Sequence, residues 1–391
     1  MSTLKEKIRK LFSSGGGNKY GLVVFLVFII LLFQAITGGI MFRPLNVANI
    51  ILQNSYIMIL AIGMLLCILT GNVDLSVGSV AAFISAMTGV MIVSNNIPVL
   101  PTIFIALIMG ALIGAFNGFW IAYLGIPAFI TTLGAMLIFR GLTLGILKGV
   151  TLGPYPGSFQ IIASGFIPDL FGKPGGFHVS TMVIAAVFMA VFTGLEIKKY
   201  RMKNTYSGEP GKNPISFFIR LAAGNGGIFG FSFLLASYAG LPNVLILIGF
   251  LVFAYTFVTS RTILGRQIYA FGGNPLAAQL SGVKTKWVFF WVYVNNSILA
   301  SLGGMVYAAR LNAASPRAGN LFELDAIAAC YIGGASAKGG IGTIPGVIVG
   351  ALIMGIMNNG MSIMGLGIDW QQMIKGLVLI LAVAFDMLTK K

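Results

Sequence analysis

The chain has 391 residues, of which 57% are hydrophobic and only 9% are charged, and its mean hydropathy is +0.95. A soluble domain is roughly one quarter charged, so the polar residues here could not cover a folded core of this size with a water-compatible surface. The composition therefore excludes soluble enzymes and nucleic-acid-binding proteins and predicts an integral membrane protein. The net charge of +16 must be explained by where the basic residues lie along the chain.

Eight apolar stretches are long enough to cross a bilayer as helices, which takes about 20 residues. They lie at 20–38, 49–70, 99–124, 128–147, 178–195, 241–259, 287–309 and 371–389. Shorter or Gly- and Pro-interrupted apolar pieces lie at 77–94, 217–238, 325–337 and 341–360. Interrupted pieces are typical of broken helices that line substrate pathways. We therefore predict an all-α polytopic membrane protein with about ten to twelve transmembrane helices, some of them broken.

Lysine and arginine are concentrated in alternate loops, which indicates the cytoplasmic side of the membrane. The cytoplasmic segments are the N-terminal tail, the loops after 195 and 259, and the C-terminal end. Their basic residues are Lys5, Lys7, Arg9, Lys10, Lys19, Lys198, Lys199, Arg201, Lys203, Lys212, Arg261, Arg266, Lys284, Lys286, Lys390 and Lys391. The opposite side holds Arg43, Lys148, Lys173, Arg310 and Arg317. Both termini are thus predicted to be cytoplasmic, and membrane topology explains the positive charge.

The sequence contains an internal repeat. PTIFIALIMGALIGAFNG at 101–118 resembles PGVIVGALIMGIMNNG at 345–360, including an identical Ala-Leu-Ile-Met-Gly. Upstream of these stretches, Asp74 and Asp325 each precede a Ser-Ala pair by the same spacing. A chance match of small and apolar residues is the alternative explanation.

We predict a single transmembrane domain, 1–391, and if the repeat is real this domain contains two halves. The halves are 49–147 and 287–389, and the charge-derived topology makes them run in opposite directions. This predicts an inverted repeat, as in many transporters, with the substrate route between the halves. The interval 148–240 is then an insert with an external loop and a basic cytoplasmic loop, and a further cytoplasmic loop spans 260–286.

The first candidate functional stretch is Gly71-Asn72-Val73-Asp74-Leu75-Ser76, which follows the second long apolar run. A carboxylate at membrane depth is costly unless it caps a helix N-terminus or faces water. Because Val77 opens the next apolar helix, the structural interpretation is that Asp74 or Ser76 acts as its N-cap. Direct contact with a translocating solute and a proton-carrying acid are the alternatives.

The second candidate is the cytoplasmic loop at 260–286. Asn274-Pro275 can begin a short helix, Leu276 to Leu280 can give it an apolar edge, and Ser281-Gly282 can end it. A short exposed helix with an apolar edge needs a partner, although an interfacial helix lying on lipid is the alternative. The residues expected to contact this partner, or to position the helix that does so, are Arg266, Tyr269, Gly272, Gly273, Asn274, Pro275, Ala277, Ala278, Leu280, Ser281 and Gly282.

The third candidate is ELDAIAACYIGGASAKGGIGTIPG at 323–346, where glycines interrupt a membrane segment. Glycine permits both close helix packing and sharp turns, so packing and a moving gate are both consistent with it. The residues assigned to this gate or packing role are Gly333, Gly334, Gly339, Gly340, Pro345 and Gly346.

Other kinds of site find no support. Cys67 and Cys330 lie singly in apolar runs, and His178, which precedes an apolar run, fits an interfacial ring. The fragment nearest to a phosphate loop, 208–213, lacks both the required spacing and the Ser or Thr. We therefore expect no metal site, no catalytic constellation and no ATP hydrolysis by this chain.

The three candidate stretches resemble a known family. Asp-Leu-Ser-Val-Gly-Ser at 74–79, Gly-Arg-Gln-Ile-Tyr-Ala-Phe-Gly-Gly-Asn at 265–274, and the glycine-rich run at 333–346 are similar to specific stretches of bacterial ABC-type monosaccharide permeases. This group includes ribose, xylose and galactoside permeases and is related to branched-chain amino acid permeases. The resemblance covers about 40–147 and 241–389. The insert makes the chain more similar to xylose and multiple-monosaccharide permeases, so a pentose such as xylose is the expected substrate.

The resemblance implies a transport subunit of the bacterial inner membrane that is not itself an enzyme. Two such subunits pair, an ATPase with two nucleotide-binding cassettes binds ATP and Mg below them, and a periplasmic or extracellular sugar-binding protein delivers the solute. This chain would hold no cofactor, and its loop at 265–282 would receive the motion of the ATPase.

The solute route is expected among Asn and Ser side chains, which suit neutral hydroxylated solutes because they donate and accept without charge. The same side chains can equally hold helices together. The pathway candidates are Asn54, Asn72, Asp74, Ser76, Asn117, Asn295, Asn296, Asn358 and Asn359.

Other functions remain as alternatives. Within the ABC class the solute could be ribose, a galactoside, a nucleoside, an autoinducer or a branched-chain amino acid. A proton-coupled sugar symporter would also show inverted repeats and would depend on Asp74, but it leaves the loop at 265–282 unexplained. A channel or a membrane enzyme would need a charged ring or a catalytic constellation.

Overall fold

The computed structural model describes residues 17–172, 174–206 and 214–389. Its helices in chain order are α2 (Gly17–Ile36), α3 (Pro44–Leu69), α4 (Val77–Gly89), α5 (Val99–Ala122), α6 (Ala128–Leu147), α7 (Gly157–Ser164), α8 (Val179–Tyr206), α9 (Pro214–Ala236), α10 (Asn243–Arg261), α11 (Ile263–Gly273), α12 (Pro275–Leu280), α13 (Thr285–Leu311), α14 (Phe322–Ile332), α15 (Ile344–Ile363) and α16 (Ile368–Thr389). Of the residues used for the topology, Lys5, Lys7, Arg9, Lys10, Lys173, Lys212, Lys390 and Lys391 lie outside the described ranges.

All eight long apolar stretches form helices, and within the described ranges nine helices are long and apolar enough to cross a membrane. The interrupted pieces are more regular than their sequences suggest. The piece at 77–94 forms α4 and a π-helical turn, 217–238 lies mostly in the full-length α9, and 341–360 lies mostly in α15. Only 325–337 stays short, because α14 ends at Ile332. The all-α polytopic architecture predicted from the sequence is confirmed.

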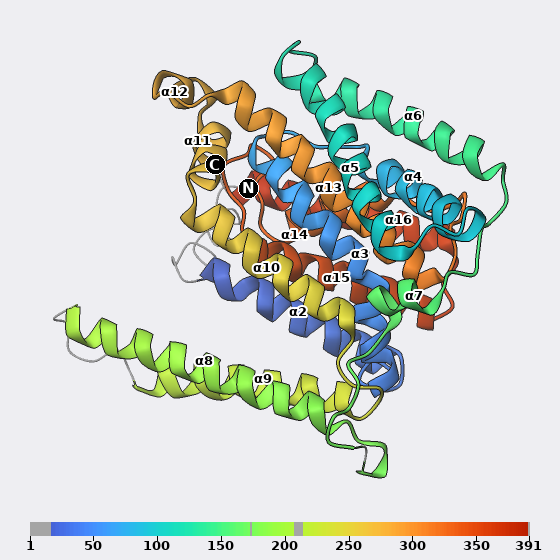
Figure 1. Ribbon diagram of the computed structural model, residues 1–391. Helices are drawn as coiled ribbons and strands as arrows, with labels where there is room; N and C mark the ends of the chain where they lie inside the picture. Colours follow the sequence, from blue (N-terminus) through green and yellow to red (C-terminus); the bar gives the residue numbers. More distant parts are fainter. Residues whose placement is uncertain (1–16, 173, 207–213, 390–391) are drawn as a thin grey trace.

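The helices of the two predicted halves make corresponding contacts. Helix α3 packs against α13 at the centre (Figure 1). The contact of α5 with α13 corresponds to that of α15 with α3. The contact of α4 with α6 likewise corresponds to that of α14 with α16. Gly110 and Gly355 lie equally far from the first residues of α5 and α15. Gly110 faces Ser301 of α13, and Gly355 faces Asn54 of α3. The matched stretches therefore occupy matched places.

The proposed match of Asp74 with Asp325 is wrong. Asp74 lies in an extended segment before α4, whereas Asp325 lies in the first turn of α14. The reason is that α14 begins before its aspartate, and Asp325 there forms an ion pair with Lys375 of α16, with a shortest N–O distance of 3.0 Å.

The insert forms a hairpin of α8 and α9 that stands to one side of the bundle (Figure 1). The hairpin is joined internally by a 3.0 Å hydrogen bond from Asn225 to Thr193. Its first helix is anchored by Asp169, whose carboxylate accepts from the N–H groups of Val179 and Ser180 at 2.7 and 3.2 Å. His178, expected as an interfacial ring, is buried beside Asp169. This histidine is a packed residue at the base of the hairpin.

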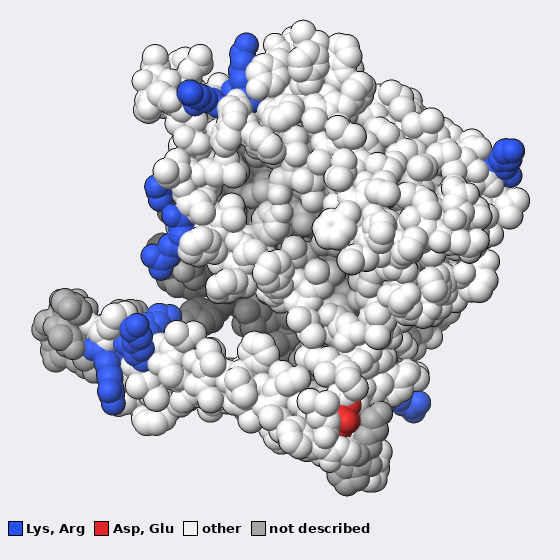
Figure 2. All heavy atoms as spheres, viewed as in Figure 1, with Lys and Arg blue, Asp and Glu red and all other residues white. Residues whose placement is uncertain are grey.

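The molecule has one strongly basic end. Lys and Arg side chains gather along one edge of Figure 2. This edge is the side where α11 and α12 lie (Figure 1). The chain segments on this side are the end of α8, the end of α10 with α11, and the start of α13. We call this side the basic end, since these segments contain Lys198, Lys199, Arg201, Arg261, Arg266, Lys284 and Lys286.

The seam between α5 and α13 depends on glycine. Gly110, Gly114 and Gly118 are buried on one face of α5, and a side chain on any of them would press against α13. Gly114, for example, faces the backbone of Val294 and the carbonyl of Tyr293. Small residues at such a seam let helix backbones approach closely, which is how helices associate within a bilayer.

This seam yields a stability prediction. Gly114→Ala should lower the midpoint of thermal unfolding of the detergent-solubilised protein, because overpacking costs about 1–3 kcal/mol. Gly134→Ala in α6 is the matched control, since a methyl group there meets open space and gains about 1 kcal/mol of helix propensity. Equal midpoints for the two variants would contradict the close approach of α5 and α13.

Candidate functional site

Two breaks in the membrane helices meet near the basic end. The first is 70–76, between α3 and α4, and the second is 333–343, between α14 and α15. The N–H of Gly340 in the second break donates to the carbonyl of Leu69 at the end of α3, at 2.9 Å. Gly71, Gly339 and Gly340 all have left-handed backbone, with φ of 78°, 85° and 70°, which suits glycine. The two breaks are thus joined backbone to backbone.

Helix α11 rests on this meeting point. Gly272 is buried so closely against it that a side chain would collide with the carbonyl of Leu69 and the amide of Gly340. The hydroxyl of Tyr269 donates to the carbonyl of Gly342 at 2.6 Å. One short helix therefore touches both breaks. We call this cluster, made of Leu69, Gly71, Tyr269, Gly272, Gly339, Gly340 and Gly342, the glycine junction.

The short helix predicted in the same loop is confirmed as α12. Asn274 begins it by accepting from the N–H of Ala277 at 3.0 Å, Pro275 is its first residue, and Gly282 follows it with φ of 84°. Leu276 and Leu280 are 67% and 81% exposed, so its apolar edge faces outward.

Of the other loop residues expected to contact or position a partner, one is buried and seven are exposed. Ala278 is buried. Those exposed are Arg266, Gly273, Asn274, Pro275, Ala277, Ser281 and Gly282. A groove of about 620 Å³ runs between α11 and the start of α13, lined in part by Ile263, Gln267 and Trp287. The loop thus offers an exposed outer surface and a fixed inner contact.

Four of the pathway candidates form one buried network. The carboxylate of Asp74 accepts from the backbone N–H of Ser76 at 2.8 Å, from the Ser76 hydroxyl at 2.6 Å and from the Asn296 amide at 2.8 Å. The Asn117 amide donates to the Ser76 hydroxyl at 3.1 Å. All four side chains are buried. The network ties the start of α4 to α5 and α13.

The N-cap expected at this site is absent. Ser76 occupies the N-cap position of α4, but its side chain makes no capping hydrogen bond. Asp74 accepts instead from the N–H of Ser76, one residue before the helix. The carboxylate closes a turn in the extended segment, as Asp side chains commonly do two residues before the N–H they bind.

The remaining pathway candidates make contacts elsewhere. Asn54 donates to Ile50 of its own helix at 2.7 Å. Asn295 accepts from the hydroxyl of Tyr255. Asn359 is buried and Asn358 is partly buried, both on α15. Asn72 lies in the first break and lines a cavity.

The assigned glycines of the third stretch also divide into two groups. Gly333 and Gly346 face each other where α14 meets α15, so close packing accounts for both. Thr343 caps α15 by accepting from the N–H of Gly346 at 3.2 Å, and Pro345 lies in its first turn. Gly334 is exposed with φ of 88°. Gly339 and Gly340 belong to the glycine junction.

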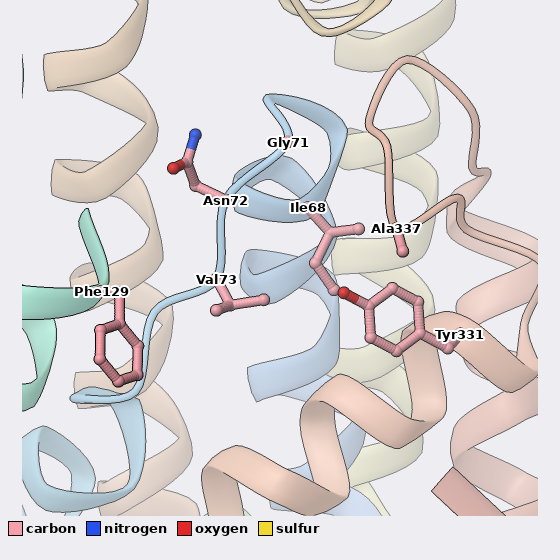
Figure 3. A pocket seen from close by; sticks show the side chains of 7 residues that line it. All are labelled: Ile68, Gly71, Asn72, Val73, Phe129, Tyr331 and Ala337. Carbon is pink, nitrogen blue, oxygen red and sulfur yellow. The ribbon is translucent and has the colours of Figure 1, made fainter. Parts of the chain in front are cut away.

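A cavity of about 290 Å³ opens beside the glycine junction (Figure 3). Its lining comprises Ile68, Gly71, Asn72, Val73, Phe129, Tyr331 and Ala337. Phe129 and Tyr331 were missed by the sequence interpretation, because an aromatic residue in an apolar run gives no signal of its own. The Asp325–Lys375 ion pair was missed too, although ionisable residues within membrane segments commonly pair with one another.

Comparison with known proteins places the chain in a family. The family model described as the permease component of the branched-chain amino acid transport system matches residues 46–383. The xylose transport system permease protein XylH of Escherichia coli (strain K12) is 36% identical over 95% of this chain and 92% of its own length. The ribose import permease protein RbsC of the same strain is 34% identical over 87% of this chain and 85% of its own length. No solved structure matches.

The buried network yields a second stability prediction. Asn296→Ala removes a donor to a buried carboxylate and should destabilise the protein by about 1.5–3 kcal/mol, the contribution of a hydrogen bond to a charged group. Asn95→Ala, at an exposed asparagine after α4, is the control and should leave the unfolding midpoint unchanged. A thermal-unfolding assay in detergent in which both variants match the parent would show that the network contributes no stability.

Proposed function

This chain belongs to the permease family that includes xylose and ribose transport proteins, and we propose that it is the membrane-spanning subunit of an ATP-driven monosaccharide importer. A pentose such as xylose is the first candidate solute, since the XylH match extends across the insert as well as both halves. Relatives named for ribose and for galactose and methyl galactoside make other monosaccharides the alternative. In this family the chain is a transport component and a multi-pass membrane protein.

The observation that carries this proposal is the position of α11. It contacts both helix breaks at the glycine junction, through Gly272 and Tyr269, while α12 next to it presents Leu276 and Leu280 to the outside. Two exposed leucines on a six-residue helix form a surface that favours a protein partner. A partner that moves α11 and α12 would therefore move both half-repeats together.

The partner is an ATPase with two cassettes that binds ATP and Mg, so this chain needs no cofactor of its own. It docks at the basic end, which is cytoplasmic together with both termini, in agreement with the concentration of Lys and Arg there. A second copy of this chain pairs with the first in the membrane. A sugar-binding protein delivers the solute at the opposite end.

Transport follows from tilting the half-repeats. Displacing α11 pulls the 333–343 segment through the Tyr269–Gly342 hydrogen bond and presses on the end of α3 through Gly272. Inverted-repeat transporters expose their solute route alternately by rocking one repeat against the other. In this conformation the N–H groups of Asn117 and Asn296 donate within the Asp74 network, so a sugar would compete for these donors only after the halves tilt.

Reconstitution tests the proposal. Proteoliposomes would contain this chain, a two-cassette ATPase and a sugar-binding protein from the same organism, and labelled xylose uptake and ATP hydrolysis would be measured with each component omitted in turn. The proposal predicts uptake only with all three components and ATP. Uptake by this chain alone, driven by a proton gradient and lost in Asp74→Asn, would overturn it in favour of a symporter. Hydrolysis stimulated by ribose but not xylose would change only the sugar.

Tyr269→Phe tests the contact that transmits the motion. It removes one hydroxyl and its hydrogen bond, worth about 1 kcal/mol, so uptake per ATP hydrolysed should fall by about three- to tenfold. Binding of the ATPase should be unchanged, because the hydroxyl faces Gly342 inside the chain. Tyr123→Phe, at an exposed tyrosine after α5, is the matched control. An unchanged ratio of uptake to hydrolysis in Tyr269→Phe would show that the hydroxyl transmits nothing.

A further inference from the structure

We infer that the 290 Å³ cavity beside the glycine junction is a low-affinity monosaccharide site on the inner part of the route, and this inference rests on the proposed importer function. None of its aromatic lining residues was expected from the sequence. The site is distinct from the buried Asp74 network, which has no room for a solute in this conformation because its side chains are fully buried.

The cavity lies where the two half-repeats meet. Asn72 and Val73 come from the break after α3, and Tyr331 and Ala337 come from the end of α14 and the break that follows it. Figure 3 shows the extended segment from Gly71 to Val73 between the side chains of Phe129 and Tyr331. Solute sites in inverted-repeat transporters lie at the interface between repeats and beside discontinuous helices. The cavity meets both conditions.

The lining suits a small neutral polyol. The cavity volume of about 290 Å³ lies just below the roughly 300–1,000 Å³ typical of small-molecule pockets. A cavity of this volume can hold one monosaccharide. The rings of Phe129 and Tyr331 offer apolar faces, and the polar groups of Asn72 and Tyr331 are uncharged. In this conformation the Asn72 amide donates to the Thr70 carbonyl at 3.1 Å, so a sugar hydroxyl would bind the side-chain carbonyl oxygen of Asn72 or replace that bond. No charged side chain is among the lining residues. A zwitterionic amino acid would leave its two charges unpaired there, so the lining favours a sugar.

The cavity wall is connected to α11. Ala337 belongs to the same segment as Gly340, which is bonded to Leu69, and Gly342, which is bonded to Tyr269. Gly71, another lining residue, packs against Gly339. A displacement of α11 therefore moves two walls of the cavity at once. Such a site holds the sugar in one position of α11 and releases it in the other.

Cysteine protection in the working importer tests the inference. Cys67 and Cys330 are fully buried, so they give a low background towards a charged maleimide. Ala337→Cys places a thiol in the cavity, and Lys338→Cys, at the exposed neighbour on the same segment, is the matched control. Saturating xylose should slow labelling of the first several-fold and leave the second unchanged. Equal rates with and without xylose, in vesicles that import xylose, would overturn the inference.

Kinetics supply a second, independent test. Tyr331→Ala should raise the xylose concentration for half-maximal uptake about fivefold or more, because stacking and a hydrogen bond each contribute about 1 kcal/mol. Tyr331→Phe should show a smaller rise, and Tyr123→Ala, which changes an exposed tyrosine outside the cavity, should show none. A fall in maximal rate at unchanged half-saturation in Tyr331→Ala would mean a structural role only. Protection of Ala337→Cys by leucine instead of xylose would also overturn the sugar assignment.

The two tests separate failure of this inference from failure of the proposed function. If the parent protein with its ATPase and binding protein imports no monosaccharide, the proposed function is wrong, and this inference falls with it. If import is intact but neither protection nor the half-saturation shift is seen, only the cavity assignment is wrong.

Discussion

The hydrogen bond from the Gly340 amide to the Leu69 carbonyl links the two helix breaks on which α11 rests. It joins the end of a helix in one half to a helix break in the other, and it can form only because glycines allow left-handed backbone and close approach at this point. Gly272 of α11 packs directly on the same carbonyl and amide. The exposed loop, both helix breaks and the lining of the neighbouring cavity are therefore in direct contact with one another.

The bilayer explains why the other breaks and polar groups are arranged as they are. Hydrocarbon offers no hydrogen bonds, so non-helical backbone and buried polar groups must be satisfied within the protein. Asp74 meets this condition through Ser76 and Asn296. Asp325 meets it differently, through the ammonium of Lys375. Two aspartates that look equivalent in the sequence therefore have different electrostatic environments, and among the described residues only Asp325 has a charged partner.

Much of the fold was predictable because membrane length and charge distribution leave strong signals. The eight long helices, α12 with its Asn274 cap, and the equivalent placement of Gly110 and Gly355 all follow from local pattern. Contacts between distant segments did not follow. Gly272 packs against Leu69, and Tyr331 and Phe129 line the same cavity. Both contacts depend on how the helices are placed in three dimensions. The expected N-cap at Asp74 is absent because its carboxylate accepts from Ser76 in a local turn and from the distant Asn296.

In the proposed mechanism, motion of α11 reaches the 333–343 segment through the glycine junction. The most direct measurement is the rate at which a charged maleimide labels Ala337→Cys in the complete importer, with and without ATP. We expect ATP to change this rate several-fold when Tyr269 is present and much less in the Tyr269→Phe background. The same rate with and without ATP, in vesicles that hydrolyse ATP and import sugar, would contradict it.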